Sequence, residues 1–91
     1  MEWLVTDVVY LKKTKNYALV LHGGPLKMIA EVTTDFPVQP GDILYPVRDA
    51  LYLINKTEDQ HAKAISAVVF SATHWRFIKK KRGRRRVTVA N

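Results

Sequence analysis

Short apolar runs separated by strong turn signals constrain the fold of this chain more than any other feature. Val, Leu, Trp and Tyr dominate residues 3–11, and a second apolar run over residues 17–21 ends at His22-Gly23-Gly24-Pro25. β-Branched and aromatic residues pack well on a pleated sheet, whereas glycine permits positive φ and proline cannot donate to a strand ladder. The pattern therefore predicts two strands joined by a polar turn at residues 12–16, with a second turn after them.

A third strand is predicted over Leu26 to Thr34 from a period of two. Met28, Ala30 and Val32 alternate there with polar or charged residues. Such alternation is typical of a strand with one buried face.

The segment Pro40-Gly41-Asp42 has the chemistry of a type II turn. Proline fixes φ for the second position of such a turn, and glycine supplies the positive φ of the third. Strands are expected to follow at Ile43 to Tyr45 and at Leu51 to Ile54. Four or five short strands at this spacing predict a small barrel. The Pro-Gly-Asp turn before large apolar residues also resembles the turn that precedes a strand in SH3-like and OB-like domains and in the MazF-type toxin barrel.

Beyond Asn55 the pattern favours a helix. Thr57-Glu58-Asp59-Gln60 has the spacing of a capping box, and four alanines follow by position 72. We therefore predict a helix from about Glu58 through about Ala72, with a stop signal at Gly83. Two strands are the alternative, because residues 68–70 and 73–78 are rich in β-forming side chains; whether Thr73 to Ile78 is helix or strand stays open.

Ninety-one residues with 47% apolar content suffice for a single modest core. The predicted class is mainly β (α+β): a small five-stranded SH3-like or OB-like barrel, or a bent sheet, with one C-terminal helix and a basic tail. Residues 1–78 are expected to form this domain, and residues 79–91 a basic arm.

Charge divides the chain into two parts. Residues 1–60 hold six basic and eight acidic groups, net −2, whereas residues 61–91 hold nine basic groups and no acidic one, net +9. A block of like charge repels itself and gains most from contact with a polyanion. The sequence therefore predicts non-enzymatic, low-specificity binding of DNA or RNA, presented by the β scaffold.

The candidate nucleic-acid-binding residues combine cations with flat rings. Cations neutralise phosphates and rings stack on bases, although Trp75 and Phe77 are also good candidates for the core. A second lysine cluster in the first predicted turn could extend the footprint or simply keep a hairpin tip soluble. The full set is Arg76, Lys79, Lys80, Lys81, Arg82, Arg84, Arg85, Arg86, Trp75, Phe77, Lys12, Lys13 and Lys15.

Three other functions fit the same residues. A protein–protein adaptor or assembly subunit could dock its basic tail on an acidic protein, and a lipid anchor could use the same charges on an anionic membrane, although a membrane partner is the weaker expectation. A toxin-like ribonuclease would need two of His22, His61 and His74 as acid and base.

No cofactor or metal is expected. The chain has no cysteine, which removes thiolate chemistry and the usual zinc fingers and fits a reducing compartment. Glu2 stands where a signal peptide would carry basic residues, so we expect a cytoplasmic location.

Overall fold

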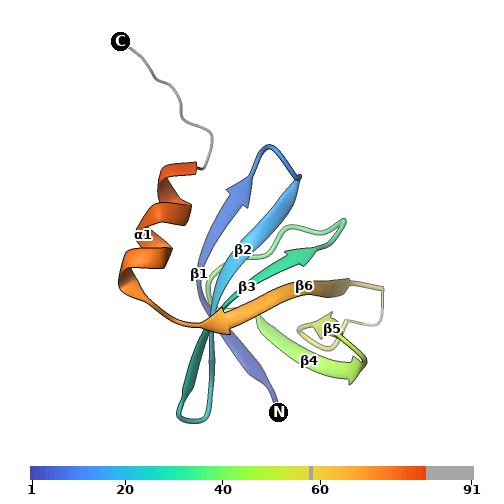
Figure 1. Ribbon diagram of the computed structural model, residues 1–91. Helices are drawn as coiled ribbons and strands as arrows, with labels where there is room; N and C mark the ends of the chain where they lie inside the picture. The colour runs from blue at the N-terminus through green and yellow to red at the C-terminus, as the bar shows by residue number, and fades with distance from the viewer. Residues whose placement is uncertain (58, 82–91) are drawn as a thin grey trace.

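A computed structural model describes residues 1–57 and 59–81 of the chain. Within them the backbone forms an antiparallel barrel with one helix on its outside (Figure 1). The elements are β1 (Trp3–Leu11), β2 (Asn16–Gly23), β3 (Leu26–Thr33), β4 (Ile43–Arg48), β5 (Leu51–Ile54), β6 (His61–Val69) and α1 (Ala72–Lys81).

The barrel closes in the order β1-β2-β3-β6-β5-β4. The neighbouring strands pair over different lengths. β1 and β2 are paired along most of their length, whereas β1 pairs with β4 at only two positions, Trp3 with Leu44 and Leu4 with Ile43. The predicted class, a small mainly β barrel with a C-terminal helix, is confirmed. It has six strands where five were expected, because residues 61–69 form a strand.

Both predicted glycine turns are present. Gly24, with φ of 57°, opens the two-residue turn between β2 and β3, a position that needs positive φ in a type II′ hairpin. Gly41 has φ of 100°, and the Asp42 amide donates to the Gln39 carbonyl at 3.1 Å across the turn. The turn chemistry of the sequence therefore sets where β3 and β4 begin.

The predicted helix start near Glu58 is wrong. The Gln60 amide donates to the Thr57 carbonyl at 3.0 Å in a turn, and β6 follows from His61. Ala62 in β6 is fully buried, and β6 pairs with both β3 and β5. Ladder pairing on two sides outweighs the helix propensity of alanine, which is worth less than about 1 kcal/mol per residue.

The helix begins instead after Ser71. The Ser71 hydroxyl accepts a hydrogen bond from the His74 amide at 3.2 Å, and the Trp75 amide donates to the Ser71 carbonyl at 2.9 Å. Ser71 is therefore the N-cap. The helix runs on to Lys81, so it includes part of the segment predicted as the basic arm; the division at residue 78 stays a prediction.

Two apolar clusters lie on opposite faces of the barrel wall. The inner one includes Val5, Leu19 and Leu44, all no more than 1% exposed. The outer one covers β1, β2 and β3 beneath Trp75. Because α1 covers the outside of β2, four consecutive β2 residues, 18–21, are buried.

Polar contacts at Asp7 join the helix to the barrel wall. The indole Nε1 of Trp75 donates to Oδ2 of Asp7 at 2.9 Å, and Nζ of Lys79 lies 3.8 Å from the same oxygen. Asp7 stands at an irregularity in the β1–β2 register, between Val5 and Asp7. The hydrogen bond therefore fixes the side-chain orientation of Trp75 over the outer cluster.

Candidate functional site

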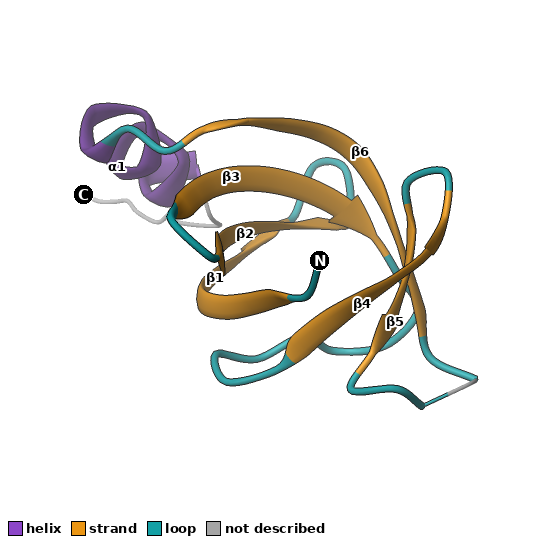
Figure 2. Cartoon of the chain, turned by 90° about the horizontal axis from the view of Figure 1, so that it is seen from below, coloured by secondary structure: helices purple, strands orange, loops and turns teal. Residues whose placement is uncertain are grey.

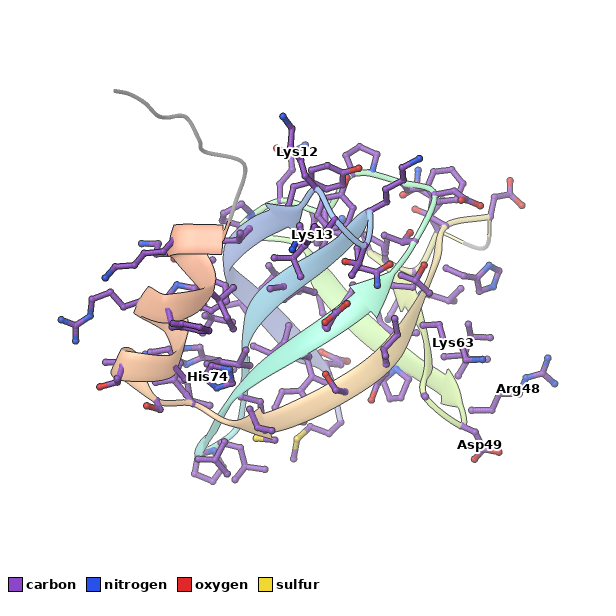
Figure 3. The ribbon with its side chains drawn as sticks, turned by 45° about the horizontal axis from the view of Figure 1, so that its top comes forward. Lys12, Lys13, Arg48, Asp49, Lys63 and His74 are labelled. Carbon is purple, nitrogen blue, oxygen red and sulfur yellow. The ribbon has the colours of Figure 1, made fainter. Side chains whose placement is uncertain are left out.

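The predicted binding residues are placed on two elements. Lys12, Lys13 and Lys15 are exposed in the turn between β1 and β2, and Figure 3 labels the first two. Arg76, Lys79 and Lys80 are exposed on α1. The C-terminal end of α1 and this turn lie at the same end of the molecule (Figures 1 and 3), which we call the basic end.

The remaining predicted cations lie at or beyond the end of the helix. Lys81 is the last residue of α1. The four arginines predicted as binding residues fall outside the described part of the chain; they are Arg82, Arg84, Arg85 and Arg86.

The two aromatic candidates lie on different faces of α1. Residues two positions apart on a helix are separated by about 200° of rotation, so Trp75 and Phe77 cannot both face the barrel. Trp75 is 6% exposed and belongs to the core, whereas Phe77 is 56% exposed. Phe77 lines a shallow hollow of about 360 Å³ on the helix together with Thr73, Arg76 and Lys80.

The barrel has an apolar opening at the start of β1, at the end of the molecule opposite the basic end. A cavity of about 70 Å³ reaches inward there, and Figure 2 shows the N-terminus between β3 and β4 at this end. Its lining is apolar apart from the tyrosine hydroxyl: Trp3, Leu21, Met28, Ala30, Val32, Leu44, Tyr52, Ala64 and Ala67.

The strands that line this cavity also carry exposed apolar side chains. Leu26 is 47% exposed at the start of β3, and Ile65 and Val69 of β6 are 55% and 74% exposed. Met1 is also exposed, and its sulfur lies close to Gly23. We call the cavity lining together with these four residues the apolar mouth.

Gly23 holds the ring of Trp3 in place at the apolar mouth. A Cβ at position 23 would lie 2.7 Å from Cε3 and 2.8 Å from Cζ3 of Trp3, so only glycine permits this approach. The sequence pattern indicated a turn here but not this contact, because Trp3 lies twenty residues away in the chain.

Gly23→Ala is therefore expected to displace the Trp3 ring. With 5-fluorotryptophan incorporated, the ¹⁹F resonance of Trp3 should shift while that of Trp75, identified through Trp75→Phe, stays in place. An unchanged Trp3 resonance would show that the contact does not position the ring.

His22 and His61 lie too far apart to form the acid–base pair that a ribonuclease needs. His22 is paired with Lys27 at the start of β3, whereas the His61 carbonyl accepts a hydrogen bond from the Thr34 hydroxyl just past its end. Seven residues of extended strand separate these places by about 20 Å. An acid and a base acting on one phosphate cannot be so far apart.

Within residues 1–57 and 59–81, no group of three or more His, Asp or Glu side chains could hold a metal ion. In the same part of the chain, no helix is both long and apolar enough to span a membrane.

Solved structures with this fold are known. The crystal structure of PmrD from Escherichia coli superposes with a TM-score of 0.83 at 39% identity and covers 91% of this chain and 100% of that one. The solution structure of PmrD from Klebsiella pneumoniae has a TM-score of 0.74 at 33% identity, over 88% of this chain and 100% of that one.

Two relatives named signal transduction protein PmrD are similar in sequence. The protein from Salmonella typhimurium is 43% identical over 83 residues, 89% of this chain and 98% of its own. The protein from Escherichia coli K12 is 43% identical over 77 residues, 82% of this chain and 88% of its own.

These relatives correct the functional prediction. Nucleic-acid binding, whether to DNA or to RNA, was the expected function and polynucleotide the expected main partner; both are wrong, because the relatives are signal transduction proteins. The net charge of the last third was correctly recognised but assigned to the wrong class of partner.

The family model confirms the relationship over most of the chain. It matches residues 1–76, which include all six strands and every residue of the apolar mouth, and it ends before Lys79 to Arg86. This chain belongs to the IraM/PmrD family.

Proposed function

We propose that this chain is a non-enzymatic signal transduction adaptor that binds a protein partner at the apolar mouth. The observation that carries the proposal is a set of exposed apolar side chains on the strands that line an apolar cavity. Contiguous exposed apolar surface with a polar surround is typical of a protein-interaction site. The relatives named as signal transduction proteins and the family match over residues 1–76 support this assignment.

The mouth residues could supply much of the binding energy. Leu26, Ile65 and Val69 are each about half or more exposed. Burying the exposed part of each contributes about 1 kcal/mol, so the three together could raise affinity by roughly a hundredfold. Trp3 adds a large ring at the centre, and tryptophan is common among the residues that dominate interface energies.

We assign the cations of the basic end a separate role in the same function, the attraction of the protein partner. The cations of the basic end would attract an acidic protein surface, and the rest of the basic run of residues 79–86 would extend that field. These cations are Lys12, Lys13, Lys15, Arg76, Lys79 and Lys80. Charges outside the interface centre mainly change the association rate and its salt dependence. A cytoplasmic location is part of the proposal, because a chain without cysteine fits a reducing compartment.

Photo-cross-linking in Escherichia coli cells tests the proposal. A benzophenone amino acid at position 26 reports on the apolar mouth, and the same amino acid at position 10 is the matched control, since Leu26 and Tyr10 are 47% and 45% exposed. Tyr10 lies toward the other end of β1. We expect a protein conjugate of discrete mass from position 26, little from position 10, and about a tenfold loss when Ile65→Asp is added.

Two outcomes would contradict this function. Conjugates from position 26 that a nuclease digests would show that the partner is a nucleic acid. Equal protein conjugates from positions 10 and 26, unaffected by Ile65→Asp, would remove the apolar mouth as the binding surface.

A further inference from the structure

One backbone edge of the barrel is open beside the apolar mouth. β5 pairs with β6 only at His61 to Lys63, and the Ala64 amide adds one hydrogen bond, to the Ala50 carbonyl at 2.8 Å. Beyond Ala64, β6 pairs with β3 alone among the residues that the structure describes. One edge of residues 65–69 therefore has no neighbouring strand there.

The register shows which backbone groups face the open edge. The Phe70 amide donates to the Lys27 carbonyl at 2.9 Å, and Val69 and Ala67 are paired with Met28 and Ala30. Residues that bond to one neighbour alternate with residues that face the other way in an antiparallel ladder. The N–H and C=O groups of Ala67 and Val69 therefore point to the open edge.

This edge lacks the features that usually block strand addition. Open edges are commonly protected by charged side chains or proline. Residues 65–69 read Ile-Ser-Ala-Val-Val and contain neither. Ala64 and Ala67 also line the cavity of the apolar mouth, so side chains of an added strand would reach that cavity.

Basic residues stand at both ends of the open edge. Lys27 lies opposite Phe70, with its Nζ 4.0 Å from the ring centroid. At the other end, Lys63 and Arg48 are both paired with Leu51, and Figure 3 shows them near each other with Asp49 beside Arg48. Each end therefore carries a net positive charge among these residues.

These charges disfavour a second copy of the chain as the added strand. Antiparallel self-pairing centred on Ala67 would place Lys27 on β3 and Lys63 of the other copy at nearly the same level of one sheet, two strands and so about 10 Å apart, twice by symmetry. Like charges about 10 Å apart still repel at low ionic strength. A segment with acidic residues at its ends would instead be attracted at both ends.

We propose that the protein partner binds by adding an extended strand to residues 65–69, with apolar side chains at alternate positions facing the mouth and acidic residues flanking them. The inference rests on the proposed adaptor function and specifies how the partner is held. Main-chain hydrogen bonds to Ala67 and Val69 would supply affinity, and the cavity would select the side chains.

Val69→Pro tests the strand addition directly. Proline at 69 removes an N–H that faces the open edge and leaves the ladder to β3 intact, whereas Val69→Thr keeps the N–H and is the matched control. The probe is a synthetic nine-residue peptide with alternating Val and Thr between paired aspartates, titrated into full-length ¹⁵N-labelled protein. A second peptide carries lysines in place of the aspartates.

The wild-type protein should show the largest shifts and slowed amide exchange at Ala67 and Val69 with the aspartate peptide. Binding should weaken up to about tenfold in Val69→Pro, the scale of one lost hydrogen bond, and less than about threefold in Val69→Thr. The lysine peptide should also bind at least about tenfold more weakly, because it meets like charge at both ends.

Three results would overturn the strand addition. They are equal binding by wild type and Val69→Pro, unprotected Ala67 and Val69 amides in the peptide-saturated wild type, and a concentration-dependent dimer that Val69→Pro converts to monomer. If Val69→Pro leaves the conjugate from position 26 intact, strand addition fails while the adaptor function stands. Absence of that conjugate in wild type contradicts the adaptor function itself.

Discussion

Trp75→Ala is expected to destabilise the protein by about 3 to 4 kcal/mol, the usual cost of truncating a buried tryptophan. Trp75 is 6% exposed and covers Val9, Val20 and Ile29 on the outer face of the sheet. Its removal also leaves the Asp7 carboxylate without its indole donor. Since domains of this size have total stabilities of about 5 to 10 kcal/mol, urea denaturation should show a large fall in midpoint.

Phe77→Ala is the matched control on the same helix. Phe77 is 56% exposed, so its truncation should cost about 1 kcal/mol or less. Equal losses from the two substitutions would contradict the docking of α1 through Trp75.

Leu19→Ala is expected to cost about 3 kcal/mol or more. Leu19 is fully buried in the inner cluster with Val5 and Leu44, where a truncated side chain leaves a cavity enclosed by the barrel wall. Leu→Ala changes at such sites lose both transfer free energy and the contacts around the cavity. Thermal and urea unfolding should report the same loss.

Leu4→Ala provides the same chemical change on the neighbouring strand. Leu4 is 42% exposed, so the expected cost is below about 1.5 kcal/mol. A Leu4→Ala variant as unstable as Leu19→Ala would show that the inner cluster is not the main source of stability.

The first five strands could be predicted because local chemistry and long-range pairing agree there. Gly24 and Gly41 stand where positive φ is required, and apolar runs lie between the turns. Local agreement of this kind needs no knowledge of which strands meet. Such agreement predicts where the strands lie in the sequence but not which strands pair to close the barrel.

β6 could not be predicted in the same way because its strand state depends on distant partners. Its alanines favour a helix locally, yet Ser66 is paired with Glu31 and Lys63 with Leu51. Only these pairings make residues 61–69 a strand. Ser71 did carry a usable signal, since serine is a strong N-cap, and it marks where the helix begins.

The sequence pattern also could not predict the apolar mouth. Alternation assigns apolar strand residues to a core, but Ile65 and Val69 are exposed because β5 ends early on β6, and Leu26 is exposed next to the turn between β2 and β3. Charge, by contrast, is visible in any sequence. It therefore dominated the functional prediction, although charge alone does not distinguish a nucleic acid from an acidic protein.

The salt dependence of binding to the protein captured from position 26 tests the central claim most directly. Docking at the apolar mouth predicts that affinity falls less than about tenfold between 50 and 200 mM salt, and that Leu26→Asp lowers it by more than about tenfold at either concentration. Binding governed by the basic run would instead fall roughly a thousandfold over that range, as for six neutralised phosphates, and Leu26→Asp would leave it unchanged. The second pattern would contradict a protein-binding apolar mouth.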